Sequence, residues 1–459
     1  MTKETLRDLY LRATQYGKPA FIERPFFGSP AAPAQAETNA SNLWGHMNAG
    51  YLIAYEYTRW WKECWALRNT AVIGDWSWLN KVRITGPDAG RFMNFATVKD
   101  LSRQVPGQIM YTPMVNEDGK VAIEGLTLKL DENEYLFTQS GAQSWLAQLT
   151  RLRDFDVTLE DVTPDYTCYP LQGPRSTDII EAASGDVFKD LKFSRWRKTR
   201  IAGEDVIVGR QGVTGEIGYE LMMRTDTGRA HELWREIRRV GQDFGIRELG
   251  LKAQMVGHIE TGIATVVRDF LPARMKGDEQ IRRFAKHWMS RDELDTMSGD
   301  LSEHFCSPAE LGWAHTINLK DHDFFGREAL VKEAEAGGPP RKLKGLMWNG
   351  DDMAALYGAL FHDGNSAPPP DLPYGQFRIS YLPVLRGDEQ VGWATGASYS
   401  PNMRRMISLG RLRNDVAVAG TELTVRWGGF SDEPTADVRA IVNDLPFIRQ
   451  HRRDEFAKP

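Results

Sequence analysis

The hydrophobic pattern in the first third of the chain alternates with polar positions over short stretches. Four such stretches, separated by Gly, Pro, Asn or Asp, occupy residues 78–86, 108–120, 121–130 and 134–141. This rhythm is typical of antiparallel β-strands. The turn NEDGK supplies residues that tolerate a positive φ angle, so we expect residues 111–115 to pair with residues 121–130 in a hairpin.

Helical spacing and strand-like segments alternate in the middle of the chain. Trp61 and Trp65 recur at helical spacing, and we expect these aromatic rings to pack inward. Residues 145–275 combine strand-like pieces such as VIVGRQGVTGEIGYELMM with amphipathic helices such as GRAHELWREIRRVGQDFG. The combination indicates an α+β fold.

The segments outside this region differ in composition. Residues 1–50 begin with a charged helical pattern and continue into a predicted surface loop at 28–42, which is rich in small residues. The charged stretch 275–305 has few apolar positions and predicts a solvated helical excursion. A linker at 337–342 precedes a region of short strands, for which we expect a small C-terminal barrel.

Length, composition and charge limit the class of protein. A chain of 459 residues and 52.0 kDa is too long for one hydrophobic core, so we expect several packed units. The chain has no apolar run long enough to cross a membrane, and its amino terminus lacks the pattern of a secretory signal. We therefore predict a soluble, cytoplasmic protein. A formal net charge of −5 with interspersed signs argues against nucleic acid as a partner.

No motif for metal, nucleotide or serine-nucleophile chemistry is present. The three cysteines are odd in number and far apart, which disfavours both a disulfide framework and a paired metal site. No His, Cys and Glu cluster has metal-ligand spacing, no glycine-rich loop has the nucleotide pattern, and no serine lies in a nucleophile elbow. We expect no metal, and organic cofactor chemistry remains.

Several motifs, in order along the chain, resemble the folate-dependent aminomethyltransferase family, which includes the T-protein of glycine cleavage. They lie between about Tyr55 and Phe430 and are YTPMVNEDGKVAIEGLTLKL, VTGEIGYEL, LGLKAQMVGHIETGI and CSPAELGWAHTINLKDHDFFGREAL. A tighter resemblance is to bacterial tetrahydrofolate-dependent aryl O-demethylases of the vanillate and syringate type. It rests on ECWALRNTAVIGD, KGLMWNGDDMAALYGALF, GASYSPNMRRMISLG and TELTVRWGG, of which the WNGDDM string is the most specific.

The resemblance implies a fold and a cofactor. The fold is an α+β, three-domain cloverleaf around a central folate channel, with a C-terminal antiparallel β-barrel. The implied units are an N-terminal extension at 1–54, a folate-binding region of two intertwined domains at 55–335, and the barrel at 343–459. The cofactor is tetrahydrofolate, and the partner is a small-molecule methyl donor. The oligomeric state stays open.

The cofactor side of the family's site is retained in this sequence. The resemblance implies that Glu220 holds the pterin ring, since a carboxylate can accept two hydrogen bonds from a planar amidine-like edge. Glu124 follows the hairpin turn, as the family's aspartate does, and would orient N5 or stabilise charge there; a structural hydrogen bond is the alternative. Tyr111, Tyr219 and Trp313 are further candidates for the cofactor side, with simple packing as the alternative.

The substrate side departs from the demethylase pattern. Gln139 replaces an arginine that grips the substrate carboxylate, and Gln254 replaces a tyrosine near the leaving oxygen. His258 lies one helical turn after Gln254 and is a candidate proton donor or a structural histidine. The pocket candidates are neutral or aromatic and predict an uncharged or cationic guest: Gln139, Ser140, Trp76 and Trp78.

The sequence therefore predicts a methyltransferase of one-carbon metabolism and aromatic catabolism. The leading hypothesis is O-demethylation, in which the methyl group of a small methoxylated compound passes to tetrahydrofolate and leaves a hydroxylated product. The alternatives are demethylation of an N-methyl or sulfonium compound, whose leaving group needs no proton, and a non-catalytic folate-binding protein.

Overall fold

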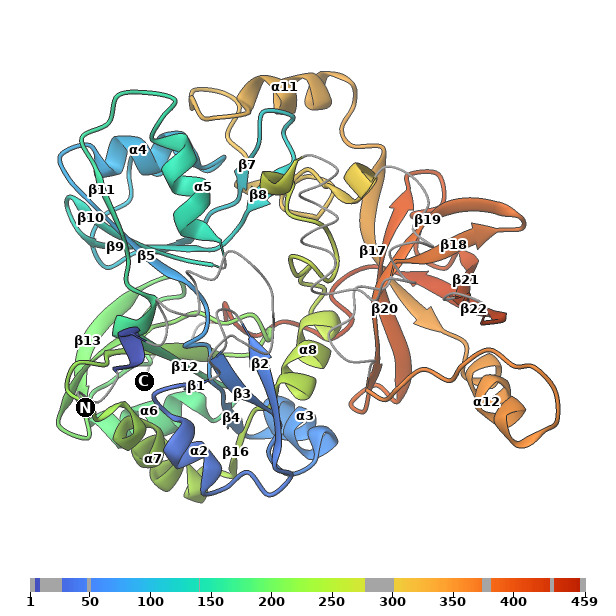
Figure 1. Cartoon of the computed structure of the whole chain (residues 1–459), viewed down its shortest axis with the longest axis horizontal. Helices are drawn as coiled ribbons and strands as arrows, with labels where there is room; N and C mark the ends of the chain where they lie inside the picture. Colours follow the sequence, from blue (N-terminus) through green and yellow to red (C-terminus); the bar gives the residue numbers. More distant parts are fainter. Residues whose placement is uncertain are drawn as a thin grey trace.

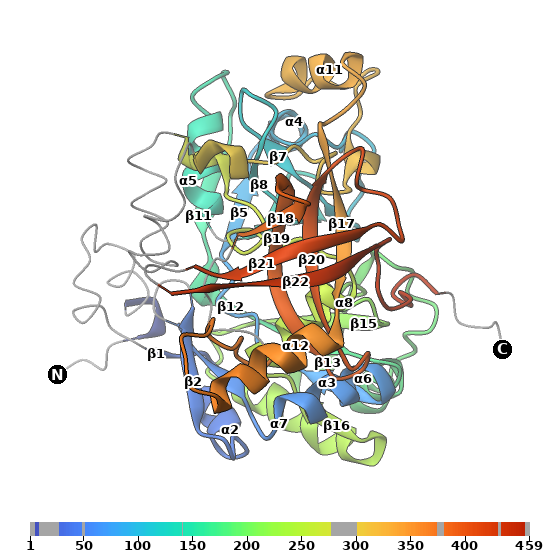
Figure 2. The ribbon, with the colours of Figure 1, turned by 90° about the vertical axis from the view of Figure 1, so that its right-hand side faces the viewer.

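The computed structural model describes residues 5–8, 27–47, 51–139, 141–276, 301–373, 381–429 and 433–454. Two α+β lobes lie one above the other, and a β-barrel lies beside them (Figure 1). Figure 2 shows the barrel face on. The arrangement confirms the predicted α+β cloverleaf with a C-terminal antiparallel barrel.

The first lobe contains a five-stranded antiparallel sheet. Its strands, in spatial order, are β11 (Thr158–Asp161), β5 (Lys81–Thr85), β10 (Glu134–Thr138), β9 (Leu126–Asp131) and β6 (Ile109–Tyr111). Alternation along β5 points Val82 and Ile84 into a core shared with two helices, α4 (Ala89–Ala96) and α5 (Ala142–Leu149). The predicted hairpin is confirmed: β7 (Met114–Val115) pairs with β8 (Val121–Ile123), and β6 pairs with β9.

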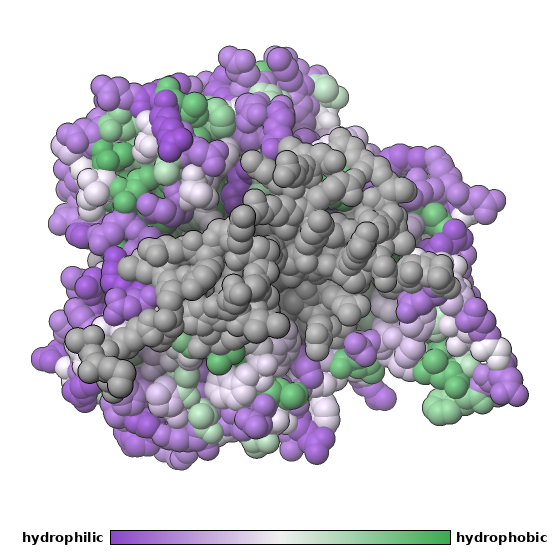
Figure 3. Space-filling view, viewed as in Figure 1, coloured by the Kyte–Doolittle hydropathy of each residue, from purple (hydrophilic) through white to green (hydrophobic). Residues whose placement is uncertain are grey.

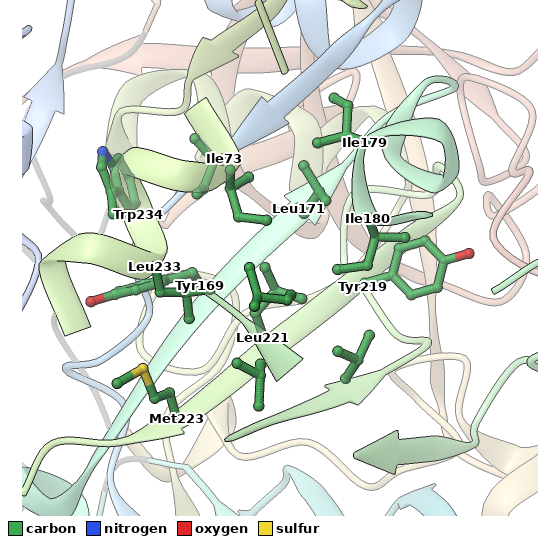
Figure 4. Close-up of a cluster of buried hydrophobic side chains, with 14 of the residues drawn as sticks. Ile73, Tyr169, Leu171, Ile179, Ile180, Tyr219, Leu221, Met223, Leu233 and Trp234 are labelled. Atoms are coloured by element: carbon green, nitrogen blue, oxygen red, sulfur yellow. The ribbon is translucent and has the colours of Figure 1, made fainter. Parts of the chain in front are cut away.

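The second lobe contains a six-stranded sheet covered by helices. Its strands, in order, are β13 (Trp196–Ile201), β14 (Glu204–Gly209), β15 (Gly218–Arg224), β12 (Tyr166–Gln172), β4 (Ala71–Ile73) and β16 (Ile246–Glu248). The helices α6 (Ser176–Ser184) and α7 (Ala230–Gly241) cover one face. The predicted amphipathic pattern of α7 is confirmed, since Leu233 and Trp234 lie buried against that face (Figure 4), and Ile237 belongs to the same core.

The N-terminal segment packs against the second lobe. It forms a three-stranded sheet in the order β1 (Phe27–Gly28), β3 (Tyr51–Glu56) and β2 (Leu43–Met47). The prediction of a surface loop at 28–42 is wrong in part. A short helix, α2 (Ala32–Ala36), buries Ala34 in the core that it shares with α7, because small side chains allow close helix contact.

The barrel is closed by six antiparallel strands. Their order is β17 (Arg341–Trp348), β20 (Arg405–Arg413), β19 (Glu389–Ser400), β18 (Leu382–Arg386), β21 (Glu422–Gly428) and β22 (Thr435–Asn443). Trp348 is buried inside the barrel. The helix α11 (Arg327–Glu335) precedes the barrel, and α12 (Gly350–Gly358) follows β17. The short 3₁₀ helices are η3 (Thr163–Asp165), η4 (Gln242–Phe244), η5 (Ala273–Met275), η6 (Leu301–His304), η7 (Ala314–Thr316) and η8 (Ala359–Phe361).

One helix places its tryptophans differently from the prediction. In α3 (Trp60–Asn69), Trp61 is 41% and Trp65 is 53% exposed, so the expectation that they pack inward is wrong. The face of α3 that packs on α8 (Leu251–Glu260) carries smaller side chains, including Cys64 and Leu67. Residues four apart share a helix face, so both tryptophans turn to solvent together.

The outer surface of the described residues is mainly hydrophilic on the face shown in Figure 3. Most of the charged stretch predicted as a helical excursion, residues 277–300, lies outside the described residues. No helix among the described residues has both the length and the apolar character needed to cross a bilayer.

Candidate functional site

Glu220 is a buried carboxylate at the centre of β15. It lies opposite Pro170 of β12 and Gly209 of β14, and its side chain is on the face of the sheet turned away from α6 and α7. The residue is 8% exposed, and its one polar contact within the described part of the chain is the Cys168 thiol at 4.0 Å. Burial raises the pKa of Glu220 to about 7. A carboxylate left without N–H donors in such a place is an acceptor for a ligand.

Lys81 is a buried cation in the same region. It is fully buried at the start of β5, and its Nζ donates to the carbonyl oxygens of Ser77 at 3.1 Å and Leu79 at 2.7 Å. Burial lowers the pKa of Lys81, while its charge favours the ionised form of Glu220. Lys81 is not among the site residues that the sequence predicts, because strand alternation assigns it to the polar side of β5.

Trp76 packs on the same face of the sheet as Glu220. Trp76 packs in one cluster with Cys168 and Met222, which are the neighbours of Glu220 on its face of the sheet. Its Nε1 is buried and has no acceptor among the described residues. Asp75 fixes the preceding turn, since it accepts hydrogen bonds from Ser77 N at 2.9 Å and from Gln35 Nε2 at 2.6 Å. Trp76 is therefore held in the cluster that contains Cys168, whose thiol contacts Glu220.

Trp78 occupies a different position from Trp76. It packs against Met47 and Ile53 of the N-terminal sheet and against Leu251 and Met255 of α8. The two tryptophans, which the sequence placed in one substrate pocket, thus face different neighbours.

Glu124 and Gln139 form a second polar cluster. The Glu124 carboxylate accepts a hydrogen bond from Gln139 Nε2 at 2.8 Å and another from the Tyr111 side chain. Gly125 allows this approach, because a Cβ there would lie 3.1 Å from the Gln139 Cβ and would meet the Thr138 carbonyl oxygen. Burial raises the pKa of Glu124 to about 7.

Tyr111 connects this cluster to Trp313. Their rings meet edge to face at 5.4 Å, and Phe270 contacts Trp313 in the same way at 5.8 Å. The structure thus brings together four predicted site residues in one group, which we call the Glu124 wall: Tyr111, Trp313, Glu124 and Gln139. Gln139 N also donates to the Asn80 carbonyl oxygen at 2.9 Å. This hydrogen bond connects the Glu124 wall to the chain segment that contains both Trp76 and Asn80. Ser140 lies outside the described residues.

Gln254 and His258 lie buried on α8, one turn apart, as the sequence predicts for a helix. His258 Nδ1 is 3.0 Å from Thr265 Oγ1, and its Nε2 is buried with no partner among the described residues. Burial and the nearby Arg268 lower the pKa of His258 to about 3. The imidazole is therefore neutral at physiological pH.

Tyr219 lies on the opposite face of β15 from its neighbour Glu220. Its ring is part of the core under α6, and its hydroxyl is 3.0 Å from Thr177 Oγ1 (Figure 4). Burial raises the pKa of Tyr219 to about 12. Alternation along a strand separates adjacent side chains, so the structure does not bring Tyr219 to the Glu220 side.

Other features of the described residues lie apart from these clusters. No group of His, Cys, Asp and Glu side chains within the described ranges could hold a metal ion. Two surface grooves are lined by other residues, one around Phe155 and His322 and the other around Trp65 and Asn402. Neither groove includes Glu220 or Glu124.

Two family models, several related sequences and a solved structure match this chain over most of its length. The GCVT N-terminal domain matches residues 36–286, and the glycine cleavage T-protein C-terminal barrel domain matches residues 380–447. A sesamin methylene transferase from Sinomonas sp. (strain No.22) is 30% identical, over 86% of this chain and 90% of that protein. An aminomethyltransferase from Halothermothrix orenii is 26% identical, over 87% and 94%. The crystal structure of glycine cleavage system aminomethyltransferase T from Bartonella henselae has the same fold, with a TM-score of 0.71 and 18% identity, covering 93% of this chain and 99% of that one.

Proposed function

This chain belongs to the glycine cleavage T-protein family, and from that premise we propose that it is a demethylase that transfers a methyl group from a small methoxylated aromatic compound to tetrahydrofolate. Tetrahydrofolate is the family's cofactor. The products are 5-methyltetrahydrofolate and a hydroxylated compound. The similarity to a sesamin methylene transferase supports a small-molecule donor of the one-carbon unit.

The observation that carries the proposal is the buried Glu220 carboxylate. Its one polar contact is a thiol at 4.0 Å, so its acceptor capacity is unused by the described residues. The amino and ring N–H groups of a pterin would satisfy it, and the Trp76 indole would line the same space. When bound, tetrahydrofolate supplies a nucleophilic nitrogen that accepts the methyl group. The protein's residues hold the two partners in line and exclude water, which supplies much of the rate.

Glu124 is the group best suited to donate a proton to the leaving oxygen. Its pKa of about 7 lies near the operating pH, so a substantial fraction carries a proton. Its hydrogen bonds with Gln139 and Tyr111 fix the carboxyl in the wall beside Trp313. His258 is less suited, because a histidine with a pKa of about 3 has no imidazolium form at neutral pH. His258 and Gln254 can orient a substrate by neutral hydrogen bonds.

A second function is demethylation of an N-methyl or sulfonium compound. The neutral state of His258 and the presence of an amide at Gln254 favour it, since those leaving groups need no acid. In that reaction Glu124 would act as a carboxylate that stabilises positive charge on the donor.

The test is turnover of purified protein with tetrahydrofolate and a panel of methoxyaromatics, N-methyl amines and methylsulfonium compounds. Mass spectrometry detects 5-methyltetrahydrofolate, and a Glu220→Gln variant serves as the control. Product from methoxyaromatics supports O-demethylation, and product from the other donors alone supports the second function. Folate binding without product from any donor would contradict both and favour a binding protein.

A further inference from the structure

His258 carries a buried ring nitrogen that no described residue satisfies. The residue lies near the C-terminal end of α8 and is 7% exposed. Its Nδ1 is 3.0 Å from Thr265 Oγ1, while its Nε2 has no hydrogen-bond partner in the described part of the chain. A buried polar atom without a partner costs free energy, so this nitrogen is a place where a ligand atom can bind.

The contact with Thr265 decides which ring nitrogen of His258 holds the proton. The imidazole is neutral, because burial lowers its pKa to about 3. If Nδ1 donated to Oγ1, the hydroxyl proton of Thr265 would have no acceptor among the described residues, and Nε2 would lack a donor. If the hydroxyl donates to Nδ1, only the Nε2–H group is left to satisfy. The second arrangement leaves fewer unpaired groups, so we assign Nε2–H as a hydrogen-bond donor.

A strained loop holds the Thr265 side chain in this position. The loop doubles back, since Asp269 N donates to the Thr265 carbonyl oxygen at 2.8 Å and Thr265 N donates to Asp269 Oδ2 at 2.7 Å. Within it, Val267 has a φ of 76°, which a β-branched residue rarely adopts. Such strain persists only where surrounding contacts fix the backbone, and it clusters at functional sites.

The C-terminal barrel supplies the contacts that fix this loop. Thr395 Oγ1 of β19 donates to Asp269 Oδ1 at 2.7 Å. Arg268 Nη2 donates to the Gly396 carbonyl oxygen and to Ser398 Oγ, each at 2.8 Å. A Cβ at Gly396 would lie 3.0 Å from Asp269 Oδ1, so the glycine lets the barrel approach the loop.

The pair of His258 and Thr265 borders the Glu124 wall. Chain neighbours of the pair belong to the hydrophobic cluster that contains Trp313 and against which Tyr111 packs: Ile259, Ala264 and Val266. Phe270, at the end of the loop, contacts the Trp313 ring edge to face at 5.8 Å. The Nε2–H donor and the Glu124 carboxyl therefore belong to adjoining parts of the structure.

We propose that His258 donates a hydrogen bond from Nε2 to the leaving oxygen of the methyl donor, and that Thr265 is the positioning residue that keeps the proton on Nε2. The inference rests on the function proposed above. When the methyl–oxygen bond breaks, its electron pair stays on the oxygen, and the proton that the oxygen takes up is balanced by one that the methylated nitrogen loses. His258 keeps its own proton throughout. A neutral N–H donor suits this task, because its hydrogen bond strengthens as negative charge develops on the oxygen.

Turnover of the full-length protein with tetrahydrofolate and methoxyaromatic donors tests the role of the pair. We expect Thr265→Val to lower kcat about 10-fold and His258→Phe about 100-fold, with little change in KM, because the hydrogen bond acts in the transition state. Thr265→Ser keeps the hydroxyl and should restore kcat. Thr225→Val is the matched control, since it removes a hydroxyl that donates to the Pro164 carbonyl oxygen at 2.7 Å, and it should leave kcat unchanged.

Nitrogen-15 NMR of the histidine-labelled protein reports the tautomer without turnover. We expect the His258 signals, identified by their absence in His258→Phe, to show a protonated Nε2 and a hydrogen-bonded, unprotonated Nδ1. Thr265→Val should move the Nδ1 resonance toward that of an unbonded nitrogen, and Thr265→Ser should not.

Three results would overturn the proposal. The first is a proton on Nδ1 of His258 in the wild-type protein. The second is a kcat that Thr265→Val and His258→Phe leave unchanged while KM rises, which assigns the hydrogen bond to ground-state binding. The third is a Thr265→Ser variant as slow as Thr265→Val, which marks a structural role. Absence of product from every methoxyaromatic donor in the wild-type protein would instead refute the function proposed above and with it the leaving oxygen, and the NMR spectra would still decide whether Thr265 sets the tautomer.

Discussion

Replacement of Glu220 by Gln separates stability from cofactor binding. The substitution keeps the shape of the side chain and removes the buried negative charge. We expect the variant to be more stable than the wild-type protein above pH 7 in the absence of folate, and to bind tetrahydrofolate much more weakly. Both effects follow from one feature, a buried carboxylate to which the described residues offer no N–H donor.

The pKa of Glu220 sets the magnitude and the sign of its contribution to the stability of the unliganded protein. It is about 7 in the folded protein against an ordinary value of 4.5. The folded state therefore holds the proton more tightly than the unfolded chain, so the stabilising contribution is complete below pH 4.5 and is lost as the pH rises to 7. At about 1.4 kcal/mol per pKa unit, ionised Glu220 costs the unliganded protein about 3 kcal/mol above pH 7.

The affinity for tetrahydrofolate should rise with pH, whereas the stability contribution of Glu220 falls with pH. If the carboxylate form binds the pterin, the dissociation constant should be about tenfold higher at pH 6 than at pH 8. In Glu220→Gln this dependence should disappear, and affinity should fall about 10- to 100-fold, because hydrogen bonds to a charged acceptor are replaced by weaker ones.

Two measurements check this reasoning. Thermal unfolding at pH 5 and pH 8 gives the stability difference, and fluorescence quenching titrations give the tetrahydrofolate affinity. Glu232→Gln, which removes a surface carboxylate from α7, is the matched control and should change neither quantity. Unchanged folate affinity in Glu220→Gln, or a variant less stable than wild type at pH 8, would refute the role assigned to Glu220.

Three further predictions concern the neighbours of Glu220 and the second polar cluster. Lys81→Met removes the charge that favours ionised Glu220, so the pH at which folate affinity falls should move upward; a profile identical to wild type would contradict the coupling. Gln139→Ala removes a hydrogen bond that lowers the pKa of Glu124, so the pH dependence of turnover assigned to Glu124 should shift to higher pH, as rate measurements between pH 5 and 9 would show. His258→Asn should leave the shape of that pH profile unchanged, because His258 is neutral throughout this range; the loss of a titration step near pH 6 would show that it is not.

The local sequence predicted helices and strands correctly where a single helical or strand-like spacing of hydrophobic residues ran through the segment. The α7 helix and the hairpin of β7 and β8 formed as expected, since amphipathic spacing and turn residues act over a few positions. Trp61 and Trp65 show the limit of such patterns. Their spacing identified the helix correctly, but the packing of α3 on α8 decided which of its faces is buried.

The sequence by itself determined the family, the fold class and the cofactor, because ordered motifs such as VTGEIGYEL carry that information locally. Only the tertiary structure decided the partners of those residues. Lys81 belongs to the five-stranded sheet but lies near Glu220 of the six-stranded sheet, and the Tyr111 ring meets the Trp313 ring although the two residues are far apart in the chain. Burial and charge pairing depend on distances in space, and chain folding sets those distances after the local pattern has been satisfied.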